Sequence, residues 1–256
     1  MSFRIAISGK GGTGKTTLAG LLISNLAAQG KKILAIDADP NSNLHMVLGI
    51  KVEGTIGGLL EEIKEKTNKL EKFPAGMNKV EYLNFKLSEI LTEGRGFDLL
   101  TMGRPEGPGC YCFANNVLRD GIEALAEKYD CLIMDSAAGM EHFNRKVAGR
   151  LDLLILTADA TERGLRTAVE IRKLISELGL QVKSIKTVLT MSNNGIIKKL
   201  LSMAEQKGLD VAVAIPEDSF IRSFDLEGRP LTDLPESSPA KAGIKELAGM
   251  ICKNQG

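Results

Sequence analysis

The sequence lacks three features that would assign it to a broad class of proteins at once. It has no run of about 18 apolar residues that could span a membrane, and its first residues, MSFRIAISG, do not form a secretory signal. Its 33 basic and 32 acidic residues give a net charge of only +1. Charge therefore predicts neither nucleic-acid binding nor attachment to an anionic membrane. We expect a cytoplasmic protein that binds neither nucleic acid nor membrane.

Cysteine is also scarce, with four residues in a chain of 256. In a reducing compartment, a close pair of cysteines more often binds a metal or takes part in redox chemistry than forms a structural disulfide. Cys110 and Cys112 are such a pair, in the segment GPGCYCFANN. Their spacing therefore favours a metal or redox site over a structural disulfide.

Short apolar segments rich in isoleucine, valine and leucine alternate along the chain with segments of helical spacing. Continuous apolar strands joined by helices are typical of a parallel sheet that is covered on both faces. An apolar content of 43% is sufficient for one large core. We predict a single doubly wound α/β domain over residues 1–256, with a mostly parallel sheet. The expected strands are residues 3–8, 32–37, 97–103, 131–135, 152–158, 186–192 and 211–215.

Residues 51–96 interrupt this alternation. The stretches TIGGLLEEIKEKTNKLEKF and KVEYLNFKLSEILTEG are rich in charge and have few strand-like segments. We interpret them as one or two charged helices with loops, forming an insertion or a lid on the domain. At the other end, the mildly amphipathic residues 241–256 are expected to dock as a helix on the core.

The segment GKGGTGKTT, residues 9–17, matches the phosphate-loop pattern G-x-x-x-x-G-K-[ST] between a strand and a helix. Glycines let successive backbone N–H groups point at phosphate oxygens, and the helix N-terminus favours negative charge. Lys15 is expected to reach the β- and γ-phosphates of ATP, and Thr16 to bind Mg²⁺. The expected nucleotide-binding residues of the loop are Gly11, Gly12, Thr13, Gly14, Lys15, Thr16 and Thr17.

A second lysine, Lys10, gives the loop the form K-G-G-x-G-K-[ST]-T. In this form it resembles the deviant Walker A loop of the ATPase family that includes MinD, ParA and the nitrogenase iron protein. The resemblance implies a P-loop NTPase fold and an ATP-dependent dimer in which Lys10 reaches across the interface to the partner's nucleotide.

The resemblance extends to two segments that end in aspartates, ILAIDADP (33–40) and CLIMDSAAG (131–139). It implies that Asp39 orients the attacking water, so that Lys10, Lys15 and Asp39 form the catalytic set. Asp135 would support Mg²⁺ together with Thr16. Asp37 would either hold a Mg²⁺-bound water or cap the end of its strand.

Two further segments resemble those that hold the adenine base in this family. They contain Asn193, and Pro216 with Glu217 in IPEDS. Both also have plain structural explanations, because asparagine favours loops and the pair Ile-Pro commonly ends a strand.

Cys110 and Cys112 follow a predicted strand and precede a helical pattern, which places them at the carboxyl edge of the sheet. Open α/β sheets bind their ligands at this edge. Two thiolates leave a soft metal ion under-coordinated, because structural sites for such ions have four protein ligands. A two-fold axis would bring a second pair to the same point. We therefore expect one four-thiolate site shared by a homodimer.

GCYCFAN together with MDSAAGMEH resembles the CooC-type nickel-insertion ATPases of carbon monoxide dehydrogenase maturation. The resemblance implies that ATP drives dimerisation and that the two C-x-C pairs hold Ni²⁺, with Zn²⁺ as another ion that suits the same thiolates. It also implies a nickel-enzyme client such as carbon monoxide dehydrogenase.

Three alternatives remain open. A reductase like the nitrogenase iron protein needs a second cysteine just after the strand at 131–135, and residues 136–143 contain none. An iron–sulfur scaffold ATPase would have the same geometry and differ only in the ion. A MinD- or ParA-like positioning ATPase is the third alternative, and MinD-like proteins use an amphipathic C-terminal helix on a membrane.

Cys131 lies within a predicted strand, and we expect it to be buried.

Overall fold

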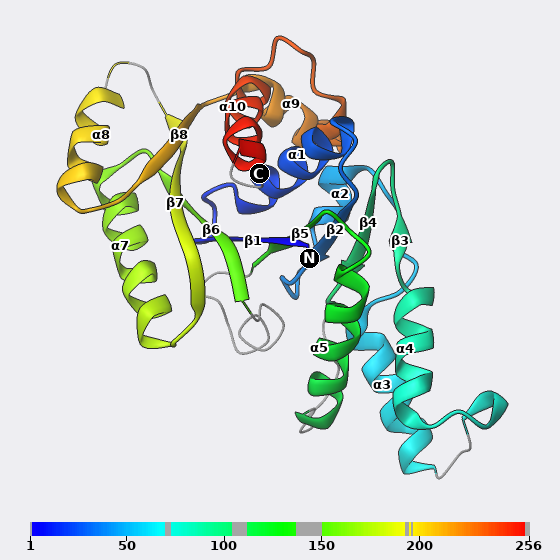
Figure 1. The fold of residues 1–256 in the computed structure, drawn as a ribbon. Coiled ribbons are helices and arrows are strands. Elements are labelled where there is room, and N and C mark those ends of the chain that lie inside the picture. Colours follow the sequence, from blue (N-terminus) through cyan, green and yellow to red (C-terminus); the bar gives the residue numbers. More distant parts are fainter. Residues whose placement is uncertain are drawn as a thin grey trace.

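The computed structural model describes residues 2–69, 73–103, 112–136, 150–192, 195 and 197–253. At its centre is an eight-stranded sheet with the order β3-β4-β2-β5-β1-β6-β7-β8, shown in Figure 1. The strands are β1 (Phe3–Gly9), β2 (Ile33–Asp37), β3 (Thr92–Glu93), β4 (Phe97–Thr101), β5 (Cys131–Asp135), β6 (Arg150–Asp159), β7 (Gln181–Ser192) and β8 (Val211–Pro216).

Neighbouring strands pair in parallel, except that β3 is antiparallel to β4. All the predicted strands are present, and the predicted doubly wound, mostly parallel α/β fold is confirmed. The sequence did not indicate β3, because two residues are too few to show a periodic pattern.

Helices cover both faces of the sheet. They are α1 (Lys15–Ala28), α2 (Leu44–Leu48), α3 (Ile56–Asn68), α4 (Lys79–Glu89), α5 (Cys112–Ala126), α7 (Glu162–Glu177), α8 (Ile197–Gln206), α9 (Ser219–Glu227) and α10 (Pro239–Lys253). Alternate residues of β1 face different cores: Ile5 and Ile7 pack with α1 and α10, whereas Ala6 packs with α3, α4 and α5. This two-sided burial explains why the central strands are mostly apolar on both faces.

The insertion contains α3 and α4, as predicted, and they extend beside α5 (Figure 1). Thr55 caps α3 by accepting a hydrogen bond from Gly58 N, and Asn78 with Glu81 forms a capping box at α4. Contact between α4 and α5 is close at Gly121, where a Cβ would lie 2.7 Å from Asn84 Oδ1.

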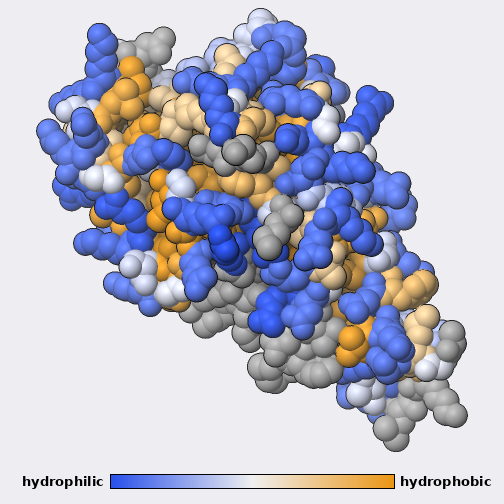
Figure 2. All heavy atoms as spheres, in the orientation of Figure 1, coloured by the Kyte–Doolittle hydropathy of each residue, from blue (hydrophilic) through white to orange (hydrophobic). Residues whose placement is uncertain are grey.

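The C-terminal helix α10 docks on the core, as expected, and buries one apolar stripe against α1 and β8. No described helix is both long and apolar enough to cross a membrane. Figure 2 shows that hydrophilic residues cover most of one face, with apolar residues emerging beside the sheet and on the insertion.

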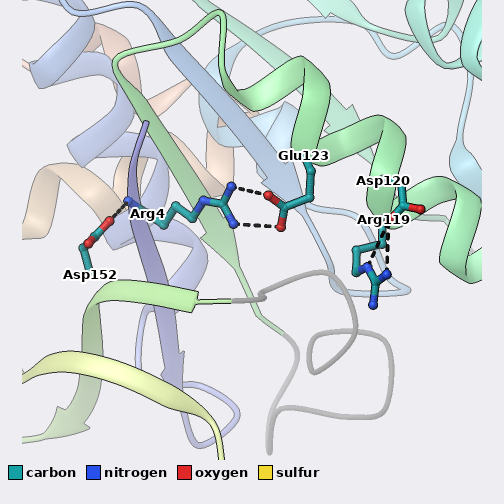
Figure 3. Close-up of polar contacts among 5 residues, drawn as sticks. All are labelled: Arg4, Arg119, Asp120, Glu123 and Asp152. Atoms are coloured by element: carbon teal, nitrogen blue, oxygen red, sulfur yellow. Dashed lines mark hydrogen bonds and ion pairs between the residues drawn. The ribbon is translucent and has the colours of Figure 1, made fainter. Parts of the chain in front are cut away.

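Arg4 of β1 fastens α5 to the middle of the sheet (Figure 3). Its guanidinium donates to both carboxylate oxygens of Glu123, with 2.7 Å between Nη1 and Oε1. Its backbone N–H donates to Asp152 of β6 at 2.9 Å, and Lys183 of β7 pairs with the same carboxylate. The Arg4 and Glu123 side chains are only 19% and 34% exposed, so water screens this pair incompletely.

We predict that Glu123→Gln lowers the free energy of unfolding by about 1–2 kcal/mol, because the half-buried Arg4 loses its charged partner. The control is Asp120→Asn on the same helix, whose pair with Arg119 has side chains 43% and 70% exposed. This control should cost about 0–0.5 kcal/mol. Urea denaturation measures both changes, and equal losses would contradict the anchoring role of Arg4.

Candidate functional site

The phosphate loop lies between the end of β1 and the start of α1, and it has one open and one packed side. Gly12 and Gly14 adopt φ values of +80° and +76°, the left-handed region that glycine tolerates best. A Cβ on Gly11, Gly12 or Gly14 would meet nothing within 4 Å. A Cβ on Gly9 would lie 2.2 Å from Thr157 Oγ1 of β6. The loop therefore leaves its glycine-rich side free for a ligand.

Threonine hydroxyls from neighbouring strands hold the packed side of the loop. Thr13 Oγ1 donates to Lys10 O at 2.8 Å and lies 2.7 Å from Thr157 Oγ1. Thr190 of β7 donates to Thr13 O at 3.0 Å. The hydroxyl of the buried Thr13 is therefore used within the protein, and only the backbone of this residue is free to bind a phosphate. Sequence patterns did not single out Thr157 or Thr190, because neither belongs to a local motif.

The two lysines of the phosphate loop differ in their exposure to solvent. Lys15 is buried, and its ammonium group donates to Lys10 O at 3.2 Å across the loop. Lys10 is exposed. Lys15 is therefore placed for the chain's own phosphate site, and Lys10 is available to a second molecule.

Two carboxylates lie side by side where β2 and β5 end, because Asp37 and Asp135 are partners in the parallel register. Asp37 accepts hydrogen bonds from Asp39 N at 3.2 Å and Leu44 N at 3.0 Å. It therefore caps the loop after its strand and the start of α2, which was one of its two predicted roles.

Asp135 is 1% exposed, and neither carboxylate oxygen has a hydrogen-bond partner among the described residues. The buried hydroxyls of Thr101 and Ser136, where β4 and β5 end, are without such a partner in the same part of the chain. Buried polar atoms are rarely left unpaired. A group of hard oxygen atoms beside a phosphate loop fits a hydrated Mg²⁺ ion.

Burial raises the pKa of Asp135 to about 7 and that of Asp37 to about 6. The Asp37 carboxylate adds to the rise in the Asp135 pKa, and Lys15 opposes it. The Thr16 hydroxyl is also near enough to lower the Asp135 pKa, although the contact falls outside hydrogen-bond geometry. A cation at this point would relieve the cost of ionising both groups.

Asp39 lies half-buried in the loop after β2 and stabilises a tight turn there. Its Oδ1 accepts from Asn41 N at 2.8 Å, and its backbone oxygen accepts from Ser42 N at 2.9 Å. Ser42 has a φ of +50°, which is uncommon for a residue with a Cβ.

A cavity of about 570 Å³ opens beside the phosphate loop. Its walls include residues of the loop and α1, of β7 and of α9 and α10, together with the end of β8 and the residue that follows it. Among them are Gly12, Gly14, Thr17, Thr190, Met191, Pro216 and Glu217. The structure thus brings Pro216 and Glu217 to the same cavity as the loop, at a suitable place for a base. Asn193 lies outside the described residues.

Cys110 lies outside the described residues, and so does the side chain of Cys112, the first residue of α5. Cys131 is buried in the core, as predicted.

We predict that nucleotide-free protein in EDTA loses stability as the pH rises from about 4 to about 7. The folded pKa values of Asp37 and Asp135 exceed the unfolded value of about 3.9, so the folded state binds more protons in this range. The variant Asp135→Asn cannot ionise at this position and so avoids the part of the stability loss that Asp135 causes. The melting temperature of the variant, relative to that of the wild type, should therefore rise between about pH 5 and pH 8. If the difference in melting temperature between variant and wild type did not change with pH, the raised pKa of the buried Asp135 would be contradicted.

Comparison with known proteins agrees with this geometry. An uncharacterized ATP-binding protein of Methanocaldococcus jannaschii is 42% identical over 247 residues, which cover 96% of this chain and 97% of that protein. The carbon monoxide dehydrogenase accessory protein CooC of Rhodospirillum rubrum is 32% identical over 254 residues, 93% of each chain.

Among solved structures, the septum site-determining protein MinD of Pyrococcus horikoshii, complexed with Mg-ADP, has a TM-score of 0.74 at 24% identity. The match covers 100% of this chain and 98% of that one, and shows the shared fold. The family model of the CobQ/CobB/MinD/ParA nucleotide binding domain matches residues 5–231. The chain therefore belongs to the CobQ/CobB/MinD/ParA family and is a P-loop ATPase.

Proposed function

We propose that this ATPase is a metallochaperone that binds nickel at a C-x-C site shared by two subunits and delivers it to an enzyme such as carbon monoxide dehydrogenase. The main support is the position of β4. Thr101 of β4 is in register with Asp37, which is in register with Asp135. Cys110 and Cys112 come after this strand in the sequence, where residues 104–111 lie outside the described residues.

The coordination chemistry of the two cysteines supports a shared site. One C-x-C pair supplies two soft thiolate ligands, and a homodimer supplies four around a two-fold axis. Such a site suits Ni²⁺ or Zn²⁺ and opens when the subunits separate, which allows release of the ion. The 32% identity to the CooC accessory protein of Rhodospirillum rubrum, over nearly the whole chain, favours nickel as cargo.

At the nucleotide, Gly11 to Thr17 would surround the phosphates, with Lys15 on the β- and γ-phosphate oxygens. Thr16 and Asp135 would hold Mg²⁺, and Asp37 would shape the loop beside it. When bound, Mg²⁺ would neutralise negative charge on the phosphates. The base would lie in the cavity with Pro216 and Glu217. Asn193 is assigned to the base from the sequence.

The remaining catalytic roles follow from exposure and position. Asp39 would orient the attacking water, and the exposed Lys10 would contribute its charge to the nucleotide of the partner subunit. ATP would bring the subunits together and hydrolysis would separate them. Metal delivery then requires that the ATP-bound dimer and the separated subunits differ in affinity for the ion. If the affinities were equal, ATP hydrolysis could not drive release of the ion.

A positioning ATPase like MinD or ParA is the main alternative, because solved structures of this fold include such proteins. Their identities of 24% and 20% support the fold alone. The apolar stripe of α10, which a MinD-like protein would need for a membrane, is packed on α1 and β8.

We predict that Lys15→Ala lowers kcat for ATP hydrolysis by at least about 100-fold, because charge at the phosphates is lost. Asp39→Ala should also cause a large loss. The double variant Cys110→Ala with Cys112→Ala should lose far less, since the proposal assigns the thiols to the metal ion and not to the phosphates. Phosphate release in the presence of Mg²⁺, but without added Ni²⁺ or Zn²⁺, measures all three. Loss of hydrolysis in the cysteine variant as complete as in Lys15→Ala would contradict separate sites.

We also predict one Ni²⁺ per dimer, because four thiolates from two chains complete one site. Titration of anaerobically purified protein with Ni²⁺, followed by light scattering and metal analysis, should saturate near half an ion per chain in the presence of ATP. The double cysteine variant is the control and should remain free of metal. One tightly bound ion per monomer would contradict the shared site, and four irons per dimer would support the reductase alternative.

A further inference from the structure

The phosphate loop is fastened to β6 at the point where β1 ends. Gly9 and Thr157 are partners in the parallel register of β1 and β6, which lie beside each other in the sheet (Figure 1). A Cβ on Gly9 would lie 2.2 Å from Thr157 Oγ1 and 3.0 Å from Thr13 Oγ1. The loop and β6 therefore meet without room for a single methyl group.

Two buried hydroxyls make this contact, and their single protons fix its direction. Thr13 Oγ1 donates to Lys10 O at 2.8 Å, so its one proton is engaged. The 2.7 Å hydrogen bond between Thr13 Oγ1 and Thr157 Oγ1 is then donated by Thr157. Ser8 O, at 3.3 Å from Thr157 Oγ1, is a more distant acceptor for the same proton. The hydrogen bonds therefore run from Thr157 through Thr13 to the carbonyl of Lys10.

The carbonyl of Lys10 is also the anchor of Lys15. The ammonium group of Lys15 donates to Lys10 O at 3.2 Å, its one hydrogen bond among the described residues. A lysine side chain is flexible, so the place of its charge depends on what its ammonium group binds. An ammonium group has three protons, and two remain for phosphate oxygens while the third is bound to Lys10 O. The position of this carbonyl therefore decides where the charge of Lys15 meets the phosphates.

The backbone of Thr13 is attached to the sheet independently of its hydroxyl. Thr190 of β7 donates to Thr13 O at 3.0 Å. Loss of the Thr157 hydroxyl would therefore leave the loop attached to β7. It would leave Thr13 Oγ1 without a donor inside the protein, which is costly and weakens the hydrogen bond from Thr13 to Lys10 O.

We propose that Thr157 is a positioning residue for ATP hydrolysis, which places the ammonium group of Lys15 through the hydrogen bonds that end at Lys10 O. The proposal goes beyond the metallochaperone function and applies to any cargo, although it rests on the proposed role of Lys15 at the phosphates. Misplacement of a catalytic group by about 1 Å can slow a reaction about 100-fold. One hydrogen bond behind the loop is therefore enough to affect the rate.

The test measures kcat at saturating ATP and Mg²⁺, divided by the number of nucleotide-binding sites found by titration. An unfolded fraction then does not lower the value. Thr157→Ala removes the hydroxyl and should lower kcat roughly 10-fold. It should also weaken binding of a non-hydrolysable ATP analogue more than binding of ADP, because ADP lacks the γ-phosphate that Lys15 contacts.

Two variants serve as matched controls for the hydroxyl. Thr157→Ser keeps the hydroxyl and should recover most of the rate. Thr67→Ala removes a hydroxyl that donates to Ile63 O on α3, away from the loop, and it should leave kcat unchanged. Melting temperature is measured for each variant.

A double-mutant cycle tests the route through Thr13. In a Thr13→Ala background the hydrogen bonds to Lys10 O are already broken, so Thr157→Ala should cause little further loss. If Thr157→Ala does not fold, Thr13→Ala interrupts the same hydrogen bonds and takes its place in the measurement of kcat. Losses that multiply in the double variant would overturn this route.

The remaining outcomes separate this inference from the role of Lys15 on which it rests. A wild-type kcat in folded Thr157→Ala would overturn the role of Thr157, and so would equal losses in Thr157→Ala and Thr157→Ser. Equal weakening of the ATP analogue and ADP would show a general collapse of the loop rather than misplacement of Lys15. Hydrolysis that persists at the wild-type rate in Lys15→Ala would overturn the role of Lys15, and this inference with it.

Discussion

Matched parallel register in the middle of the sheet is the constraint on which the site depends. Ile7 of β1 is a partner of Asp135, Asp135 of Asp37, and Asp37 of Thr101. All these strands end at one edge because they run in the same direction. This edge therefore brings together the phosphate loop, both buried carboxylates and the end of β4. In the sequence, 92 residues or more separate Gly9 from Thr101 and Asp135.

Burying two carboxylates at this edge has an energetic cost that the nucleotide-free protein carries. Asp37 recovers part of it through two backbone N–H groups, whereas Asp135 has no such partner among the described residues. Binding of a cation lowers the cost of the charge on Asp135, so the free energy of binding depends on the ionisation of this residue. Strain of this kind is common at functional sites, where local stability is given up for ligand binding.

The same edge explains how one ATPase scaffold can serve a specialised function. Hydrolysis depends on the phosphate loop and the carboxylates, and these belong to β1, β2 and β5. Cys110 and Cys112 come after β4 in the sequence, and Gly103, the last described residue before them, donates a hydrogen bond to Ser42. Under the proposed function, changes around these cysteines would alter the cargo while the central strands continue to hold the nucleotide.

Local pattern by itself determined much of this protein. Apolar runs identified the strands, glycines and Lys15 identified the phosphate loop, and strand context predicted that Cys131 is buried, because each of these signals lies within a few consecutive residues. Tertiary structure alone decided which distant groups meet. Thr157 and Thr190 support the loop, Arg4 pairs with Glu123, and Ser42 contacts Gly103, 61 residues away. Ordinary serines, threonines and salt-bridge residues have no local signature, since their roles arise only from the partners that folding brings to them.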